Sequence, residues 1–152
     1  IFESYPTIGY NYRMTDIQAA IGLKQVERLA GLVARRRALA ERYGEILSGI
    51  SGLALPFEPE WARSNWQSYC VRLPEGCDQR KVMQHMLDHG VSTRRGIMCS
   101  HLEAPYAGAT LRHLLPESVR AQAQCVLIPL FPQMSELEQN QVAEALSDGC
   151  AV

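Results

Sequence analysis

Apolar residues recur at helical spacing from residue 16 to about residue 47, and this pattern predicts one long helix near the start of the chain. Thr15 is a good N-cap, and Gln18 three residues later completes a capping box. Residues 48–49, Ser-Gly, end the pattern. The apolar positions form two tracks, the second interrupted by Arg36: Ala19, Leu23, Val26, Ala30 and Val33, and Leu29, Leu32, Leu39, Tyr43 and Ile46.

A continuous helix of this length would span roughly 50 Å, more than the width of a compact domain of this size. Part of it must therefore overhang. Its first half is apolar on two sides, with Ile17 and Ile21 on one and Leu23 and Val26 on the other. Either the helix is sandwiched inside its own domain, or it docks on another domain or subunit. Exposed apolar faces usually mark interfaces, which favours docking.

Short strands and helices alternate along the rest of the chain. We expect strands at 68–73, 91–95 and 125–130, helices at 78–89, 117–124 and 135–147, and an irregular stretch at 96–116. Asp78 is the expected cap of one helix, and Ser135 with Glu138 that of the last. Three short strands with helices on one side predict an α+β fold, a two-layer sandwich with a small, mainly antiparallel sheet.

The composition is that of one globular domain, covering residues 1–152. The net charge of -1 provides no field for holding a nucleic acid or an anionic membrane. No apolar run approaches the ~20 residues needed to cross a bilayer, and no signal peptide is visible, so we expect a cytoplasmic protein. The first residue is Ile1 rather than Met, which suggests a piece of a longer chain.

Cysteines and histidines offer no obvious metal centre. The five cysteines, at positions 70, 77, 99, 125 and 150, are odd in number and contain no C-x-x-C pair, which argues against a disulfide framework and a structural zinc site. His85 and His89 have the i,i+4 spacing of metal ligands, but no third ligand stands near them in the sequence. We therefore expect free thiols and no metal.

The polar residues with most chemical interest lie in two loops. Residues 9–14 lead into the N-terminus of the long helix, where free N–H groups and the helix dipole favour an anion. Residues 93–101 carry Arg94 and His101. The chain contains no Gly-rich phosphate loop, no G-x-S-x-G elbow and no H-E-x-x-H motif, so we expect no self-contained active site and no catalytic residue.

These loops carry a family resemblance. Residues 9–22, GYNYRMTDIQAAIG, followed by Gln25 and Leu29, resemble a segment of the DegT/DnrJ/EryC1/StrS family of sugar aminotransferases. Three later stretches resemble the C-terminal pattern of that family in the same order: residues 68–69; residues 93–96 with His101 and Tyr106; and residues 127–132 with Met134, Glu138 and Val142. The resemblance covers nearly the whole chain.

The resemblance implies a homodimeric fold-type I enzyme that uses pyridoxal phosphate (PLP) to move an amino group from glutamate to a keto sugar attached to a nucleotide. In the family, the lysine that forms the Schiff base with PLP lies in a large domain upstream of this segment. Neither Lys24 nor Lys81 has the context of that lysine, and the chemistry needs such an amine. We therefore expect a small C-terminal domain without the large domain, inactive and without bound PLP on its own.

The same resemblance suggests roles for individual residues. Asn11 is similar to the asparagine that reaches the PLP phosphate of the neighbouring subunit, although it could instead serve only a turn. Arg13 could contact a substrate phosphate or pair with an acidic residue. Arg94 and His101 lie where the loop of the family faces the substrate, although a loop histidine can also be a local hydrogen-bonding residue.

The expected partners follow from these assignments. The interface loop and long helix, residues 1–48, and residues 1–26 above all, are expected to join two copies of the chain, and a large aminotransferase domain is a second partner if one is encoded upstream. An alternative is a free-standing interaction or self-assembly module that keeps the fold without catalysis. A weaker alternative is a small-molecule binder that uses the loop at 96–116.

Overall fold

The computed structural model of the chain describes residues 4–96, 98–108 and 113–151. Residues 1–3 of the predicted interface, and residues 97 and 109–112 of the predicted loops, lie outside the described residues, as does residue 152. The helices are α1 (Asp16–Val26), α2 (Leu29–Leu47), α3 (Gln79–Asp88), α4 (Pro116–Gln124) and α5 (Glu136–Ala151). The strands are β1 (Tyr69–Arg72), β2 (Arg94–Arg95) and β3 (Cys125–Ile128), and two short 3₁₀ turns are η1 (Ser100–Leu102) and η2 (Ala104–Tyr106).

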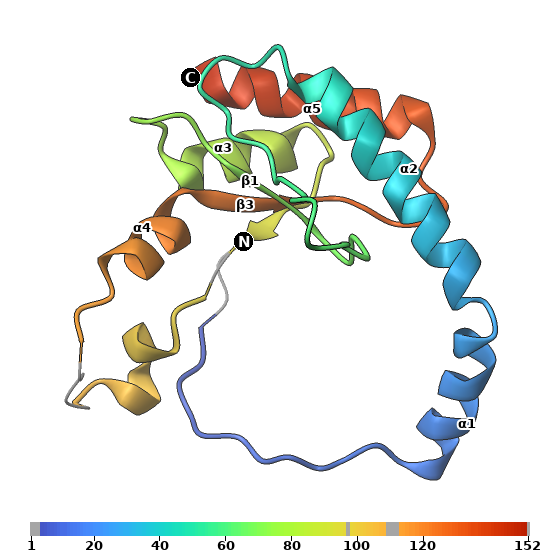
Figure 1. The fold of residues 1–152 in the computed structure, drawn as a ribbon. Coiled ribbons are helices and arrows are strands. Elements are labelled where there is room, and N and C mark those ends of the chain that lie inside the picture. Colours follow the sequence, from blue (N-terminus) through green and yellow to red (C-terminus); the bar gives the residue numbers. More distant parts are fainter. Residues whose placement is uncertain (1–3, 97, 109–112, 152) are drawn as a thin grey trace.

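The three strands form an antiparallel sheet in the order β1-β3-β2, as predicted. Val71 stands opposite Val126, and both side chains are buried. Because side chains alternate across a strand, Cys70 and Cys125 face the other side of the sheet. Helices α2, α3 and α5 lie over the buried face (Figure 1). The predicted α+β two-layer sandwich is confirmed.

The core lies between this sheet face and the three helices, and two of its buried polar side chains, Tyr43 and Gln139, are hydrogen-bonded. Tyr43 and Tyr69 pack with ring centroids 5.1 Å apart, and the Tyr43 hydroxyl donates to the carbonyl of Pro129 at 2.9 Å. Gln139 is fully buried, and its Nε2 donates to the carbonyl of Leu39 at 2.9 Å. These bonds remove the penalty that an unpaired polar group would carry in the interior.

Arg36 interrupts an apolar track because it joins α2 to two loops. Its Nη1 donates to the carbonyls of Trp66, Gln67 and Leu130 at 3.0, 2.8 and 3.1 Å. A guanidinium carries several donors in a fixed plane and can satisfy several carbonyls together. The charged side chain of Arg36 in this apolar track therefore has a structural role, because it bonds α2 to the two loops.

The prediction of one continuous helix was wrong, because the structure divides it at Glu27 and Arg28. The N–H of Arg28 donates to the carbonyl of Gln25, three residues back, instead of four, and neither proline nor glycine stands at the break. Figure 1 shows α1 and α2 as separate segments joined by a short turn. This tightening bends the chain without a signal in the sequence.

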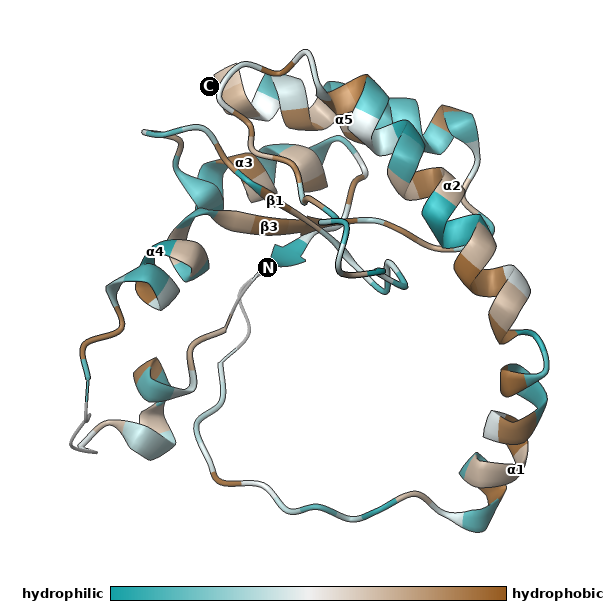
Figure 2. Ribbon diagram, viewed as in Figure 1, coloured by the Kyte–Doolittle hydropathy of each residue, from teal (hydrophilic) through white to brown (hydrophobic). Residues whose placement is uncertain are grey.

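Helix α1 buries none of its residues, whereas α2 buries Leu39, Ala40, Tyr43 and Leu47. Figure 2 shows apolar residues along α1, which lies away from the sheet. Residues 4–15 form an extended segment that leads into α1. The interpretation of a helix sandwiched inside its own domain was therefore wrong for the described chain. The predicted overhang is confirmed.

The capping predictions hold at three helices. Thr15 and Gln18 form both hydrogen bonds of the capping box, Asp78 accepts from the N–H groups of Arg80 and Lys81, and the Ser135 and Glu138 hydrogen bonds precede α5. Helix α5 continues to Ala151, past the predicted end at 147. Among the described residues, none of the helices combines the length and the apolar character that a bilayer crossing requires.

The predicted strand at 91–95 shrinks to Arg94–Arg95. The N–H of Val91 is used by the end of α3, where it donates to the carbonyl of Met86 at 2.8 Å. Gly90 before it has a φ of 77°, the left-handed conformation that ends helices. The first residues of the predicted strand are therefore part of a helix termination.

Candidate functional site

The N-terminal segment at residues 5–9 lies against the loop at residues 98–106. The N–H of Tyr5 donates to the Glu103 carboxylate at 3.3 Å, and a groove of about 390 Å³ runs between the segments. The groove is lined by Tyr5, Thr7, Ile8, Gly9, Met98, Ser100, Glu103, Pro105 and Tyr106. The loop with η1 and η2 and the N-terminal segment thus form one surface.

Asn11 shapes the turn that leads into α1. Its Oδ1 accepts from the N–H of Arg13 at 3.1 Å, and Arg13 has a φ of 65°. The turn role proposed as an alternative for Asn11 therefore exists, and it uses the side-chain oxygen alone. The exposed amide also carries two N–H groups, the type of donor from which a phosphate oxygen accepts hydrogen bonds.

Arg13 is exposed at this turn. It forms no ion pair with an acidic side chain within the ranges that the structure describes. The alternative of a structural pairing for Arg13 therefore has no support there, and its guanidinium faces solvent.

Arg94 and His101 lie on the part of the domain that contains the sheet, one on β2 and the other in η1. Arg94 stands on β2 opposite Leu127, and His101 is half-buried in η1. The extended segment that carries Asn11 and Arg13 runs away from β2 towards α1 (Figure 1). The contacts described between the loops involve residues 5–9, so the four predicted residues do not form one cluster within this chain.

Gly96 anchors the loop to the sheet. Its N–H donates to the carbonyl of Cys125 at 2.8 Å. A Cβ at this position would lie 2.6 Å from both Cys125 Cβ and Cys70 Sγ, so only glycine fits without displacement. Burial, together with neighbouring Cys125, raises the pKa of the Cys70 thiol to about 12 and keeps it protonated. The side chains of Cys70 and Cys125 therefore lie directly against Gly96.

Helix α4 holds the loop from its other side. The N–H of Cys99 donates to Gln122 Oε1 at 2.7 Å, and the Cys99 thiol lies 3.2 Å from the carbonyl of Ser118. Buried Gln79 donates from Nε2 to the carbonyls of Gln122 and Cys125, at 2.9 and 2.7 Å. The position of His101 thus depends on α3 and α4. Sequence reasoning missed both glutamines, because neither belongs to a recognisable motif.

The two lysines are both exposed and lie on separate helices. Lys24 on α1 pairs with Glu27 at 2.7 Å, and Lys81 lies on α3. Neither lysine therefore presents an enclosed amine of the kind that a Schiff base with PLP requires. Within the described ranges, no group of three or more candidate metal ligands occurs.

His85 and His89 lie close together at the C-terminal end of α3. Their ring centroids lie 4.2 Å apart with the ring planes tilted by 31°, and Nδ1 of His89 lies 2.8 Å from the carbonyl of His85. The pair packs on α3 close to α5, where the side chain of Gln141 donates to the carbonyl of His89.

Comparisons with known proteins show that this chain is similar to aminotransferases of one family. The family model described as DegT/DnrJ/EryC1/StrS aminotransferase family matches residues 2–147. The aminotransferase TlmJ from Streptoalloteichus hindustanus is 31% identical, with a TM-score of 0.78, and the match covers 90% of this chain and 36% of that one. DesV from S. venezuelae is 26% identical, with a TM-score of 0.81, and the match covers 98% of this chain and 40% of that one.

A third structure supports the fold alone. The sugar aminotransferase Spr1654 from Streptococcus pneumoniae, described as putative, is 22% identical, with a TM-score of 0.82, and the match covers 91% of this chain and 36% of that one. The chain thus spans between 36 and 40% of the length of these three solved structures.

Proposed function

The chain belongs to the DegT/DnrJ/EryC1/StrS aminotransferase family, and we propose that it is the C-terminal, small-domain portion of a PLP-dependent nucleotide-sugar aminotransferase. The observation that carries this proposal is the extent of the matches. The family model runs through almost all of this chain, while the chain accounts for little more than a third of the solved structures.

In this proposal the chain supplies contacts to cofactor and substrate. Asn11 donates from Nδ2 to the PLP phosphate, near the positive end of α1. When bound, PLP provides the electron sink for amino transfer. Arg13, Arg94 and His101 bind the substrate, the arginines through the charged, bidentate hydrogen bonds that guanidinium forms with phosphate oxygens. Since these residues lie apart within one chain, two copies or a further domain must complete the site.

The amine that the chemistry requires is expected to come from a large domain. Lys24 is occupied by Glu27 and Lys81 is exposed, so neither is enclosed in the way that a Schiff-base lysine must be. The chain alone is then inactive. The alternative of a free-standing self-assembly module draws support from α1, whose apolar side chains are exposed.

The test uses the 152-residue chain with added PLP. We expect no visible absorbance band that depends on a lysine, and no amino transfer. A stoichiometric band that disappears in Lys24→Ala or Lys81→Ala would contradict the proposal. The two functions separate when a large domain of the family is supplied as a second chain: activity that falls in Asn11→Ala supports the aminotransferase, and self-association without any activity supports the module.

A further inference from the structure

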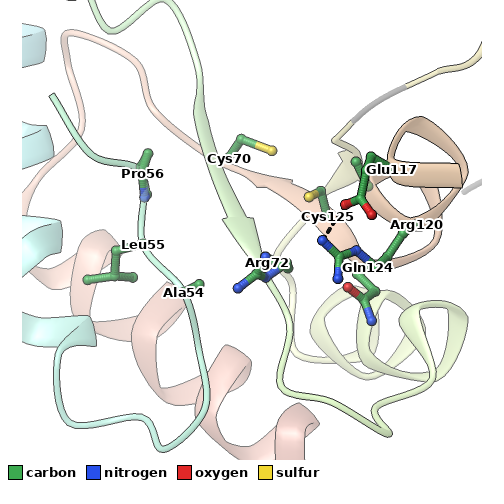
Figure 3. Close-up of a pocket in the computed structure, with 10 residues that line it drawn as sticks. Ala54, Leu55, Pro56, Cys70, Arg72, Glu117, Arg120, Gln124 and Cys125 are labelled. Carbon is green, nitrogen blue, oxygen red and sulfur yellow. Dashed lines mark hydrogen bonds and ion pairs between the residues drawn. The ribbon is translucent and has the colours of Figure 1, made fainter. Parts of the chain in front are cut away.

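A second pocket lies on the outer side of the sheet, on the face opposite α2, α3 and α5. It encloses about 440 Å³ between β1, β3, α4 and the segment at 54–56. Figure 3 shows its lining: Ala54, Leu55, Pro56, Cys70, Arg72, Glu117, Arg120, Ala121, Gln124 and Cys125. It is separate from the groove at residues 5–9 and 98–106, and the proposed function uses none of its residues.

The pocket carries more positive than negative charge. Arg72 extends from the end of β1, and Arg120 extends from α4. Figure 3 shows both arginines among the side chains that line the pocket, together with Gln124. Glu117 pairs with Arg120, whereas the Arg72 guanidinium forms no hydrogen bond or ion pair with any residue of the described chain. One positive charge is left without a counter-charge.

The two arginines are positioned by rigid neighbours. Arg72 stands opposite Cys125 in the β1–β3 register, and its backbone N–H and carbonyl both bond to Ala54 at 2.9 Å. The end of α4 is held by the two hydrogen bonds that Gln79 donates to Gln122 and Cys125. Both arginines therefore line one pocket as a consequence of the fold, and an anion bound there would offset the repulsion between their like charges.

We propose that this pocket binds the phosphate group of a small phosphorylated molecule. Arg72 and Arg120 approach from two elements, so each can engage a different edge of a tetrahedral phosphate. A carboxylate has one negative charge and two oxygens, whereas a phosphate monoester has three acceptor oxygens and more negative charge to share between two guanidiniums. The Gln124 amide adds a neutral donor. The pocket volume falls within the range of small-molecule sites, which leaves room for the organic part of a phosphate ester.

Isothermal titration calorimetry on the 152-residue chain tests the proposal at constant ionic strength, with inorganic phosphate, glycerol 3-phosphate and acetate as probes. We expect phosphate binding with a dissociation constant on the order of 1 mM, and weaker binding of acetate. Tighter binding of glycerol 3-phosphate than of phosphate identifies an ester as the ligand, and the reverse identifies the free ion. Absence of binding by both overturns the proposal.

Variants of single residues locate the site. Arg72→Ala and Arg120→Ala are each expected to weaken phosphate binding about tenfold, the effect of losing one charge-assisted hydrogen bond. Glu117→Gln is expected to tighten it severalfold, because it frees Arg120 and removes a negative charge. Arg63→Ala, an exposed arginine outside the pocket, is the matched control and leaves the affinity unchanged.

The difference between Arg72→Ala and Arg63→Ala separates a site from general attraction to arginines. Equal losses in Arg72→Ala and Arg63→Ala, or no gain in Glu117→Gln, would overturn the proposal. Circular dichroism checks that each variant is folded. Where Arg72→Ala unfolds, Arg72→Gln replaces it, since it keeps most of the side-chain stem and removes only the charge.

Discussion

The side-chain oxygen of Gln122 accepts a hydrogen bond of 2.7 Å from the backbone N–H of Cys99, and this contact ties α4 to the loop that carries His101. The N–H belongs to a buried residue, so its loss of a partner cannot be repaired by bulk water. A glutamine outside any motif thus positions a predicted binding residue.

Replacement of Gln122 by alanine is expected to lower the free energy of unfolding by about 1–3 kcal/mol, because the Cys99 N–H is left unpaired. Amide hydrogen exchange at Cys99 should become faster, which reports on the loop directly. Gln67→Ala removes an exposed glutamine side chain and is the control, with little change expected. Unchanged exchange at Cys99 would show that the loop is held by other contacts.

A pair of glycines tests the close approach under the loop. Gly96→Ala places a Cβ 2.6 Å from Cys125 Cβ and Cys70 Sγ, and we expect a loss of stability of about 1–3 kcal/mol. Gly44→Ala, inside α2 with open space around its Cβ, should instead stabilise the chain by up to about 1 kcal/mol. Urea denaturation of both variants measures the difference, and a neutral Gly96→Ala would contradict the packing described.

Glu58 makes the stability depend on acid pH. A hydrogen bond from Arg37 and one from the N–H of Ser64 at 2.6 Å lower the pKa of the Glu58 carboxyl below its ordinary 4.5. Because the folded-state pKa is the lower one, the contribution of Glu58 is fully present above pH 4.5 and is lost as the pH falls through the folded value. Glu58→Gln should therefore destabilise the chain at neutral pH and much less in acid.

The free energy of unfolding of Glu58→Gln, measured by urea denaturation across this pH range, checks the prediction. Glu60→Gln, at an exposed glutamate nearby, is the control and should show no such dependence. A difference between Glu58→Gln and the unmodified chain that stays constant with pH would show that the charge of Glu58 is not what stabilises the loop.

Self-association through α1 is the fourth prediction. Ile17 and Ile21 are 76% and 58% exposed, and burying each is worth ~1.5–3 kcal/mol. Replacing both with aspartate should shift the chain towards monomer in analytical ultracentrifugation, since an unpaired carboxylate is costly to bury. Leu137→Asp changes a residue of α5 that is 79% exposed and should have no effect. A monomeric unmodified chain at high concentration would refute the interface.

Local rules were sufficient for much of the fold. A capping box depends on residues three positions apart, as at Thr15 and Gln18, and strand alternation depends on nearest neighbours. The caps and the three short strands were therefore readable from the sequence, and so was the family, whose motifs lie in continuous segments. The break at Glu27 and Arg28 was not readable, because its hydrogen bonds change without a residue type that demands it.

The amino-acid sequence by itself determined the α+β class, the capped helices, the family and the exposed apolar character of α1. Only the tertiary structure decided which distant residues meet. Gln79 reaches Cys125, and Arg72 shares a pocket with Arg120, because strand register and helix packing bring together positions far apart in the chain. Such contacts depend on how the whole core packs, so a local sequence pattern does not predict them.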